Sequence, residues 1–134
     1  MMTRNEKDRL WQAALAVRKN AYAPYSGFSV GAALLSDDGR IFVGCNVENA
    51  AYSPTLCAER VALGAAIAAG ARSFTAIAVV GGRGEELAAT PPCGVCRQSL
   101  SEFTDGSMTV LFYEGDARTE CTLAELLPHG FTLK

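Results

Sequence analysis

Apolar side chains between residues 6 and 20 recur at the spacing of one helix face, at Leu10, Ala13, Ala14 and Val17. Side chains three or four positions apart lie on the same side of an α-helix. The pattern therefore predicts a helix over 6–20, with this apolar stripe packed against a sheet.

Two strands are expected next, over 29–35 and 41–47, where apolar residues predominate. They flank Asp37-Asp38-Gly39-Arg40, and an Asp-Gly pair between two apolar runs is a strong signal for a tight β-hairpin. We predict that these two strands pair in antiparallel fashion.

Apolar runs over 75–80 and 109–113 predict further strands, and helix-forming residues follow Glu59 and Cys96 and recur over 123–127. The expected order of elements is αββαβαβα. Most strands are apolar on both faces, which requires cover on both sides. The sequence thus predicts an α/β fold, a three-layer α/β/α sandwich with a mixed five-stranded sheet, in a single domain over 1–134. The polar segment 83–87 is interpreted as a link inside this domain.

The helix after Glu59 carries few polar residues on any side, a pattern that is typical of a buried helix. In so short a chain, this favours cover by another subunit. A large core within one subunit would give the same sequence pattern.

Three cysteines carry the candidate chemistry. Cys57 stands in Cys57-Ala58-Glu59, and the other two stand in Pro92-Cys93-Gly94-Val95-Cys96. Soft thiolates favour zinc among the common divalent ions, and three protein ligands leave a fourth tetrahedral position for water. Each half of the motif is predicted to open a helix, so two positive helix ends would face the metal and favour thiolate over thiol.

Glu59 is a candidate general base, because it lies two residues after the first cysteine and can reach the open position without occupying it. Zinc lowers the pKa of bound water from about 16 to about 7, and a nearby carboxylate can take that proton and return it to a leaving group. Arg60 is expected to donate hydrogen bonds to the ligating sulfurs without binding the metal itself. The alternative is a non-catalytic module with a structural zinc, whose fourth position would be closed.

Five blocks of the chain stand out, in this order: residues 21–33 (AYAPYSGFSVGAA), 44–52 (GCNVENAAY), 57–60 (CAER), 92–98 (PCGVCRQ) and 126–128 (LLP). Together they resemble the cytidine deaminases of the small homotetrameric type. The Cys₃ set with a free glutamate and a P-C-x-x-C element is itself the arrangement of zinc deaminases.

The resemblance implies zinc-dependent hydrolytic deamination of cytidine and 2′-deoxycytidine in pyrimidine salvage. It implies that Cys57, Cys93 and Cys96 bind Zn²⁺ and that Glu59 shuttles protons to N3 and the 4-amino group. The substrate contacts that it implies are Phe28 for the base, Asn46 and Glu48 for the ribose 3′-hydroxyl, the backbone of Ala58 for the amino group, and Tyr52 and Phe131 contributed across subunits of a homotetramer. The simpler alternative is that these residues only form a loop, core or a docked tail.

Substrate choice is the most open part of this interpretation. Blasticidin S deaminases share the C-A-E and P-C-G-x-C-R-Q elements, but Asn46 and Glu48 together with Phe28 favour an ordinary nucleoside. A formal charge of −2 with interspersed signs gives no basis for nucleic-acid binding. Without an apolar signal core or a membrane-spanning run, and with an odd cysteine count, we expect a cytosolic protein that does not bind membranes. Cys45 and Cys121 are interpreted as small buried apolar residues.

Overall fold

One mixed sheet of six strands forms the centre of the computed structural model, which describes residues 2–114 and 117–133. The strand order is β2-β1-β3-β5-β6, with β4 paired to β3. Only the β3 and β5 pair is parallel among the described strands. The elements are α1 (Arg4–Arg18), β1 (Ser29–Ser36), β2 (Ile41–Cys45), α2 (Ala58–Ala68), β3 (Phe74–Arg83), β4 (Glu86–Ala88), α3 (Gly94–Ser101), β5 (Thr109–Glu114), β6 (Ala117–Thr122) and α4 (Leu123–Leu126).

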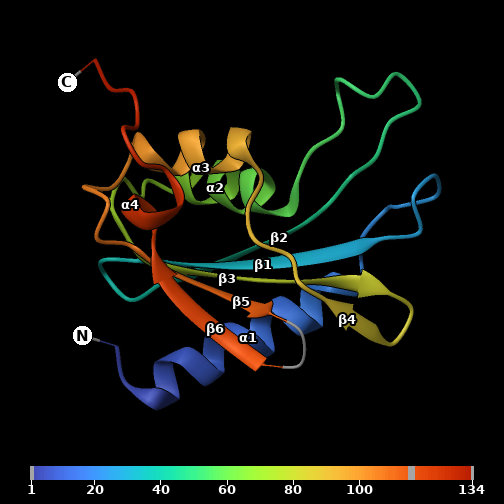
Figure 1. Ribbon diagram of the computed structural model, residues 1–134, viewed down its shortest axis with the longest axis horizontal. Helices are drawn as coiled ribbons and strands as arrows, with labels where there is room; N and C mark the ends of the chain where they lie inside the picture. The colour runs from blue at the N-terminus through green and yellow to red at the C-terminus, as the bar shows by residue number, and fades with distance from the viewer. Residues whose placement is uncertain (1, 115–116, 134) are drawn as a thin grey trace.

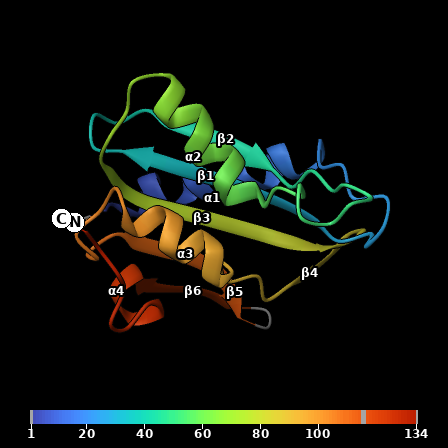
Figure 2. The ribbon, with the colours of Figure 1, turned by 90° about the horizontal axis from the view of Figure 1, so that it is seen from above.

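Helices cover both faces of this sheet, which confirms the predicted three-layer α/β/α sandwich (Figure 1). Helix α1 lies on one face, and α2, α3 and α4 lie on the other. Viewed from above in Figure 2, α2 and α3 run side by side across the sheet. Both helices that begin at the cysteine motifs therefore belong to the same layer.

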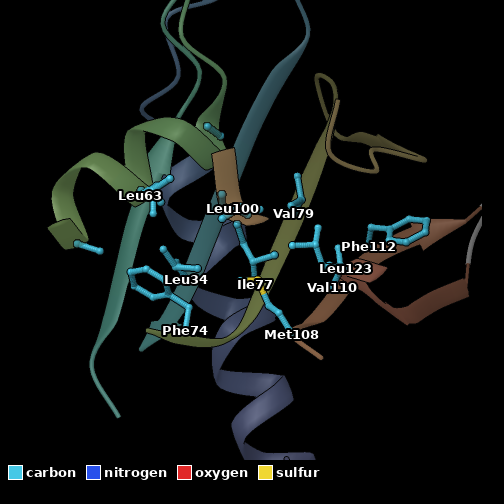
Figure 3. Packing of buried hydrophobic residues seen from close by; sticks show 14 of the residues in the cluster. Leu34, Leu63, Phe74, Ile77, Val79, Leu100, Met108, Val110, Phe112 and Leu123 are labelled. Carbon is cyan, nitrogen blue, oxygen red and sulfur yellow. The ribbon is translucent and has the colours of Figure 1, made fainter. Parts of the chain in front are cut away.

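Alternating side chains of the central strands fill two separate cores. In β3, Ile77 and Val79 point toward α2 and α3, whereas Ala78 and Val80 point toward α1. Figure 3 shows the first of these cores, in which Ile77 and Val79 pack with Leu100 of α3. Burial of both faces explains why these strands read as nearly continuous apolar runs.

The predicted hairpin is confirmed, because β1 and β2 pair antiparallel around the turn at Gly39, whose φ is +90°. Helix α1 begins two residues before its predicted start. Thr3 accepts from the backbone N–H of Glu6, and the Glu6 carboxylate accepts from the N–H of Thr3, so the two form a capping box that fixes the helix start.

Two expectations about the fold need correction, and a third stays untested. Segment 83–87 is not a simple link, because it turns back into β4, which pairs with the end of β3. Strand β6 was also not predicted, and the sheet has six strands instead of five. Helix α2 leaves Gly64, Ala65 and Ala68 exposed within one chain, so its expected cover by another subunit stays a prediction.

Two glycines let helices approach the sheet closely. A Cβ atom on Gly44 of β2 would lie 2.5 Å from the carbonyl oxygen of Ala58 and 2.4 Å from the nitrogen of Ala62, both in α2. On Gly31 of β1 it would lie 2.0 Å from the carbonyl oxygen of Ala14 in α1. Because α2 carries the first cysteine motif at its start, Gly44 sets the depth of that motif above the sheet.

No helix in the described part of the chain has both the length and the apolar character needed to cross a bilayer.

Candidate metal centre and active site

The three motif cysteines meet at the beginnings of α2 and α3. Cys57 is the N-cap residue of α2, Cys93 is the N-cap residue of α3, and Cys96 lies in the first turn of α3. Both N-cap residues have extended backbone angles, and neither side chain caps its own helix. The thiols are thus free to point at a common centre, as the sequence predicts.

The sulfur atoms lie close enough together to bind one metal ion. All three Sγ atoms lie within 4.8 Å of one another, and those of Cys57 and Cys93 are 3.8 Å apart. Zinc–sulfur bonds of about 2.3 Å place the sulfurs of a tetrahedral site about 3.8 Å from one another. Among the described residues, this is the one group of three or more potential metal ligands, and its donor set suits zinc.

The thiol of Cys57 ionises readily. Hydrogen bonding from Cys96, and then from the Arg60 guanidinium, lowers the pKa of Cys57 to about 5. The same proton-sharing contact raises the pKa of Cys96, because a second thiolate beside the first is disfavoured. The contacts of the cluster thus favour the thiolate form of Cys57, which is the form that binds metal ions.

Arg60 lies beside Cys57. Its Nη2 atom is 3.7 Å from the Sγ atom of Cys57 and donates to the carbonyl oxygen of Thr55 at 3.3 Å. A guanidinium in this position offsets the negative charge that several thiolates concentrate.

Glu59 is a buried carboxyl group beside the cysteines, with 4% of its surface exposed. Burial raises the pKa of Glu59 to about 7, and the neighbouring Cys57 thiolate also raises it. A carboxyl group is rarely buried in a core unless it has a partner or a function. Its neighbours Ala58 and Ala62 are fully buried, so the start of α2 is a tightly packed support for this group.

Asn46 and Glu48 brace the loop that precedes β1. The buried Asn46 side chain accepts from the N–H of Val30 at 2.8 Å and donates to the carbonyl oxygen of Phe28 at 2.9 Å. The Glu48 carboxylate accepts from the N–H groups of Tyr25 and Ser26, at 2.9 and 3.1 Å, and from the Ser26 hydroxyl. The Ser26 hydroxyl bond is the main cause of the lowered pKa of Glu48.

Phe28 lies at the carboxyl end of β3. A Cβ atom on Gly81 would lie 2.9 Å from the Phe28 ring and 2.7 Å from the hydroxyl of Thr90, which precedes the second cysteine motif. The guanidinium of Arg83 lies 5.6 Å from the centroid of the Phe28 ring. Arg83 is not among the site residues predicted from the sequence. Its position at the end of an apolar strand is the only sequence feature that would have marked it as a candidate.

Tyr52 and Phe131 both have exposed side chains in a single chain. Tyr52 is 79% exposed and has a positive φ of 65°. Phe131 is 68% exposed in the segment after α4, and its carbonyl oxygen accepts from the Gln98 amide. Their predicted action across subunits therefore stays a prediction.

Comparisons with known proteins agree with this geometry. Residues 4–112 match the family model of the cytidine and deoxycytidylate deaminase zinc-binding region. The cytidine deaminase of Sporosarcina psychrophila is 48% identical over 127 residues, which cover 93% of this chain and 90% of that protein. The cytidine deaminase of Halalkalibacterium halodurans is 44% identical over 129 residues, with 95% of each covered.

Solved structures give the same result. The crystal structure of cytidine deaminase from Burkholderia pseudomallei has a TM-score of 0.84 and 46% identity, covering 97% of this chain and 100% of that one. That of cytidine deaminase from Mycobacterium tuberculosis has a TM-score of 0.81 and 39% identity, covering 95% and 98%. The matched zinc-binding region contains all three clustered cysteines. The chain therefore belongs to the cytidine and deoxycytidylate deaminase family.

Proposed function

We propose that this protein hydrolyses cytidine and 2′-deoxycytidine to uridine and 2′-deoxyuridine with release of ammonia, a reaction of pyrimidine salvage in the cytosol. The observation that carries the proposal is the buried Glu59 carboxyl group beside three convergent cysteines at two helix N-termini. A purely structural zinc would have no use for a carboxyl group buried at this cost.

Cys57, Cys93 and Cys96 would hold Zn²⁺ in this site. Bound zinc supplies a water molecule that is nucleophilic at neutral pH, because the metal lowers the pKa of that water. The N-termini of α2 and α3 and the Arg60 guanidinium stabilise the thiolates. These groups keep the metal from being overloaded with negative charge.

Glu59 moves the protons of the reaction. It takes one proton as the water oxygen bonds to C4 of the base and delivers this proton to N3. It then takes the second proton from the same oxygen, which becomes the C4 carbonyl oxygen, and delivers it to the 4-amino nitrogen. The C4–N bond then breaks and ammonia leaves. The start of α2 holds Glu59 rigidly, since Ala58 and Ala62 beside it are fully buried. The backbone of Ala58 would orient the amino group.

Asn46, Glu48 and Phe28 would bind the nucleoside. The Asn46 amide and the Glu48 carboxylate already make hydrogen bonds to the loop before β1 and to the start of that strand. A carboxylate has about four lone-pair sites and an amide has two donors and two acceptor sites, so both keep capacity for a sugar hydroxyl. Their loop contacts hold them in fixed orientations, which lowers the entropy cost of binding. Phe28 offers an aromatic surface at the carboxyl end of β3.

The chain would act as a homotetramer in which Tyr52 and Phe131 reach sites on neighbouring subunits. Support comes from apolar groups that one chain leaves exposed. They lie on α2, on the edge strand β2, in the 47–56 segment and in the C-terminal segment, and include Val43, Val47, Tyr52, Leu56, Ala65, Ala68, Phe131 and Leu133. Exposed apolar residues gathered on several surfaces are typical of protein–protein interfaces.

Ammonia release by the purified, zinc-quantified protein tests the function. Cytidine, 2′-deoxycytidine, cytosine, CMP and blasticidin S are supplied separately under identical conditions. We expect turnover of the two free nucleosides and little of the other three. Turnover of blasticidin S alone would keep the chemistry and replace the substrate, whereas a zinc-loaded protein inert toward all five would contradict the proposal.

A further inference from the structure

Arg97 connects the second cysteine motif to the C-terminal segment. In α3, its Nε atom donates to the carbonyl oxygen of Pro92 at 2.6 Å, and its Nη1 atom donates to the carbonyl oxygen of Leu126 at 2.8 Å. Pro92 is fully buried and immediately precedes Cys93. One guanidinium therefore joins two backbone points that are far apart in the sequence.

The two residues before Cys93 cannot be held by hydrogen bonds from their own backbone nitrogens. Pro91 and Pro92 have no backbone N–H, so neither residue can donate a hydrogen bond to its surroundings. The Pro92 carbonyl and the Cys93 nitrogen belong to one planar peptide unit. A donor that fixes this carbonyl therefore also fixes the direction in which the chain enters Cys93.

The other end of the connection is itself anchored. Leu126 ends α4, and a carbonyl at a helix end has no partner within its helix. Gln98, next to Arg97, donates to the carbonyl oxygen of Phe131 at 2.9 Å. Figure 1 shows the C-terminal segment rising past α3. Two consecutive side chains of α3 thus hold this segment in place.

We propose that Arg97 is a positioning residue for the metal centre, which orients the Cys93 thiolate by clamping the Pro92–Cys93 peptide against the end of α4. The inference rests on the proposed zinc site. The planar fork of arginine makes both hydrogen bonds at once, whereas a lysine ammonium reaches only one of the two carbonyls well. Loss of the clamp leaves Cys93 free to shift and weakens its bond to the metal.

Zinc release into a colorimetric chelator measures this effect without any substrate. Wild-type protein is compared with Arg97→Gln, Arg97→Lys and the matched control Arg72→Gln. Arg72 also donates to two backbone carbonyls, of Ile67 and Ala71 at 2.9 and 2.8 Å, but it lies beyond the opposite end of α2. Circular dichroism and urea unfolding are recorded for every variant, so that loss of stability is measured separately.

We expect Arg97→Gln to release zinc roughly 10- to 100-fold faster than wild type, as is usual when a group supporting a metal ligand is removed. Arg97→Lys should give a smaller increase, and Arg72→Gln should match wild type. If Arg97→Gln does not fold, the zinc-release rates of Arg97→Lys and Arg72→Gln are compared instead. Faster release from Arg97→Lys supports the inference, and equal release overturns it.

Folded Arg97 variants that release zinc at the wild-type rate would overturn the inference, as would an equal acceleration in Arg72→Gln. A wild-type protein that binds zinc but deaminates no nucleoside would overturn the proposed function and leave this comparison intact.

Discussion

Replacing Gly44 by alanine tests whether the sheet sets the position of α2, which carries the proposed catalytic Glu59. The new Cβ atom would lie 2.4 Å from the nitrogen of Ala62 and 2.5 Å from the carbonyl oxygen of Ala58. These are backbone atoms of α2, so no side chain can rotate away to make room. Ordinary contact requires α2 to move outward by roughly one ångström, as overpacked cores do.

The expected cost has two parts. Overpacking of this kind lowers the free energy of unfolding by about 1–3 kcal/mol. The moving atoms belong to the first turns of α2, which carry Cys57 and Glu59. A misplacement of about 1 Å at a reacting group can reduce the rate about 100-fold. We therefore expect kcat/KM for cytidine to fall about 100-fold in protein that urea titration shows to be folded.

Gly31→Ala is the matched control. Its Cβ atom would lie 2.0 Å from the carbonyl oxygen of Ala14, so it overpacks the sheet against α1. Helix α1 carries none of the proposed site residues. This variant should lose comparable stability and keep most of its kcat/KM per folded molecule. Equal activity losses in both variants, or wild-type activity in Gly44→Ala, would refute the reasoning.

Three further variants test other parts of the account. Glu59→Gln should retain zinc and lose at least about 100-fold in kcat, since a general base contributes about that much; near-normal turnover with stoichiometric metal would remove its proton-shuttle role. Glu48→Ala should raise KM for cytidine roughly 10- to 100-fold, the usual value of a hydrogen bond to a charged group, and an unchanged KM would remove the sugar contact. Thr3→Ala breaks the capping box of α1 and should lower the free energy of unfolding by about 0.5–2 kcal/mol. An unchanged urea midpoint for Thr3→Ala, or a changed kcat, would contradict that assignment.

Strands buried on both faces were predictable, and the two peripheral strands were not. The runs that became β1, β3 and β5 are apolar because helices cover them on both sides. In β6, by contrast, Arg118 and Glu120 are exposed at the edge of the sheet, and the strand exists because it pairs with β5. Strand β4 covers only Glu86–Ala88, too short for any periodicity. Pairing across the sheet, more than local pattern, creates these two elements.

The candidate site was likewise predictable only in part. The cysteines and Glu59 were identifiable because ligand type and close spacing carry the chemistry. The bonds of Arg97 to Leu126 and of Gln98 to Phe131 join residues 29 and 33 positions apart. No local pattern encodes such contacts. Likewise, the sequence places Asn46 and Glu48 after a strand but does not show that they already hold the loop before β1.

The meeting of the two cysteine motifs itself follows from topology. Helix α2 leads into β3 and α3 leads into β5, and these two strands are parallel. A helix that packs on a sheet and returns the chain to a strand runs roughly opposite to that strand, so α2 and α3 must point the same way. Their N-termini then lie at the carboxyl ends of β3 and β5, where sites in open α/β sheets are found. Cys57 and Cys93, 36 positions apart, are thus brought together by one parallel strand pair, while Gly44 of the edge strand β2 sets how closely α2 approaches the sheet.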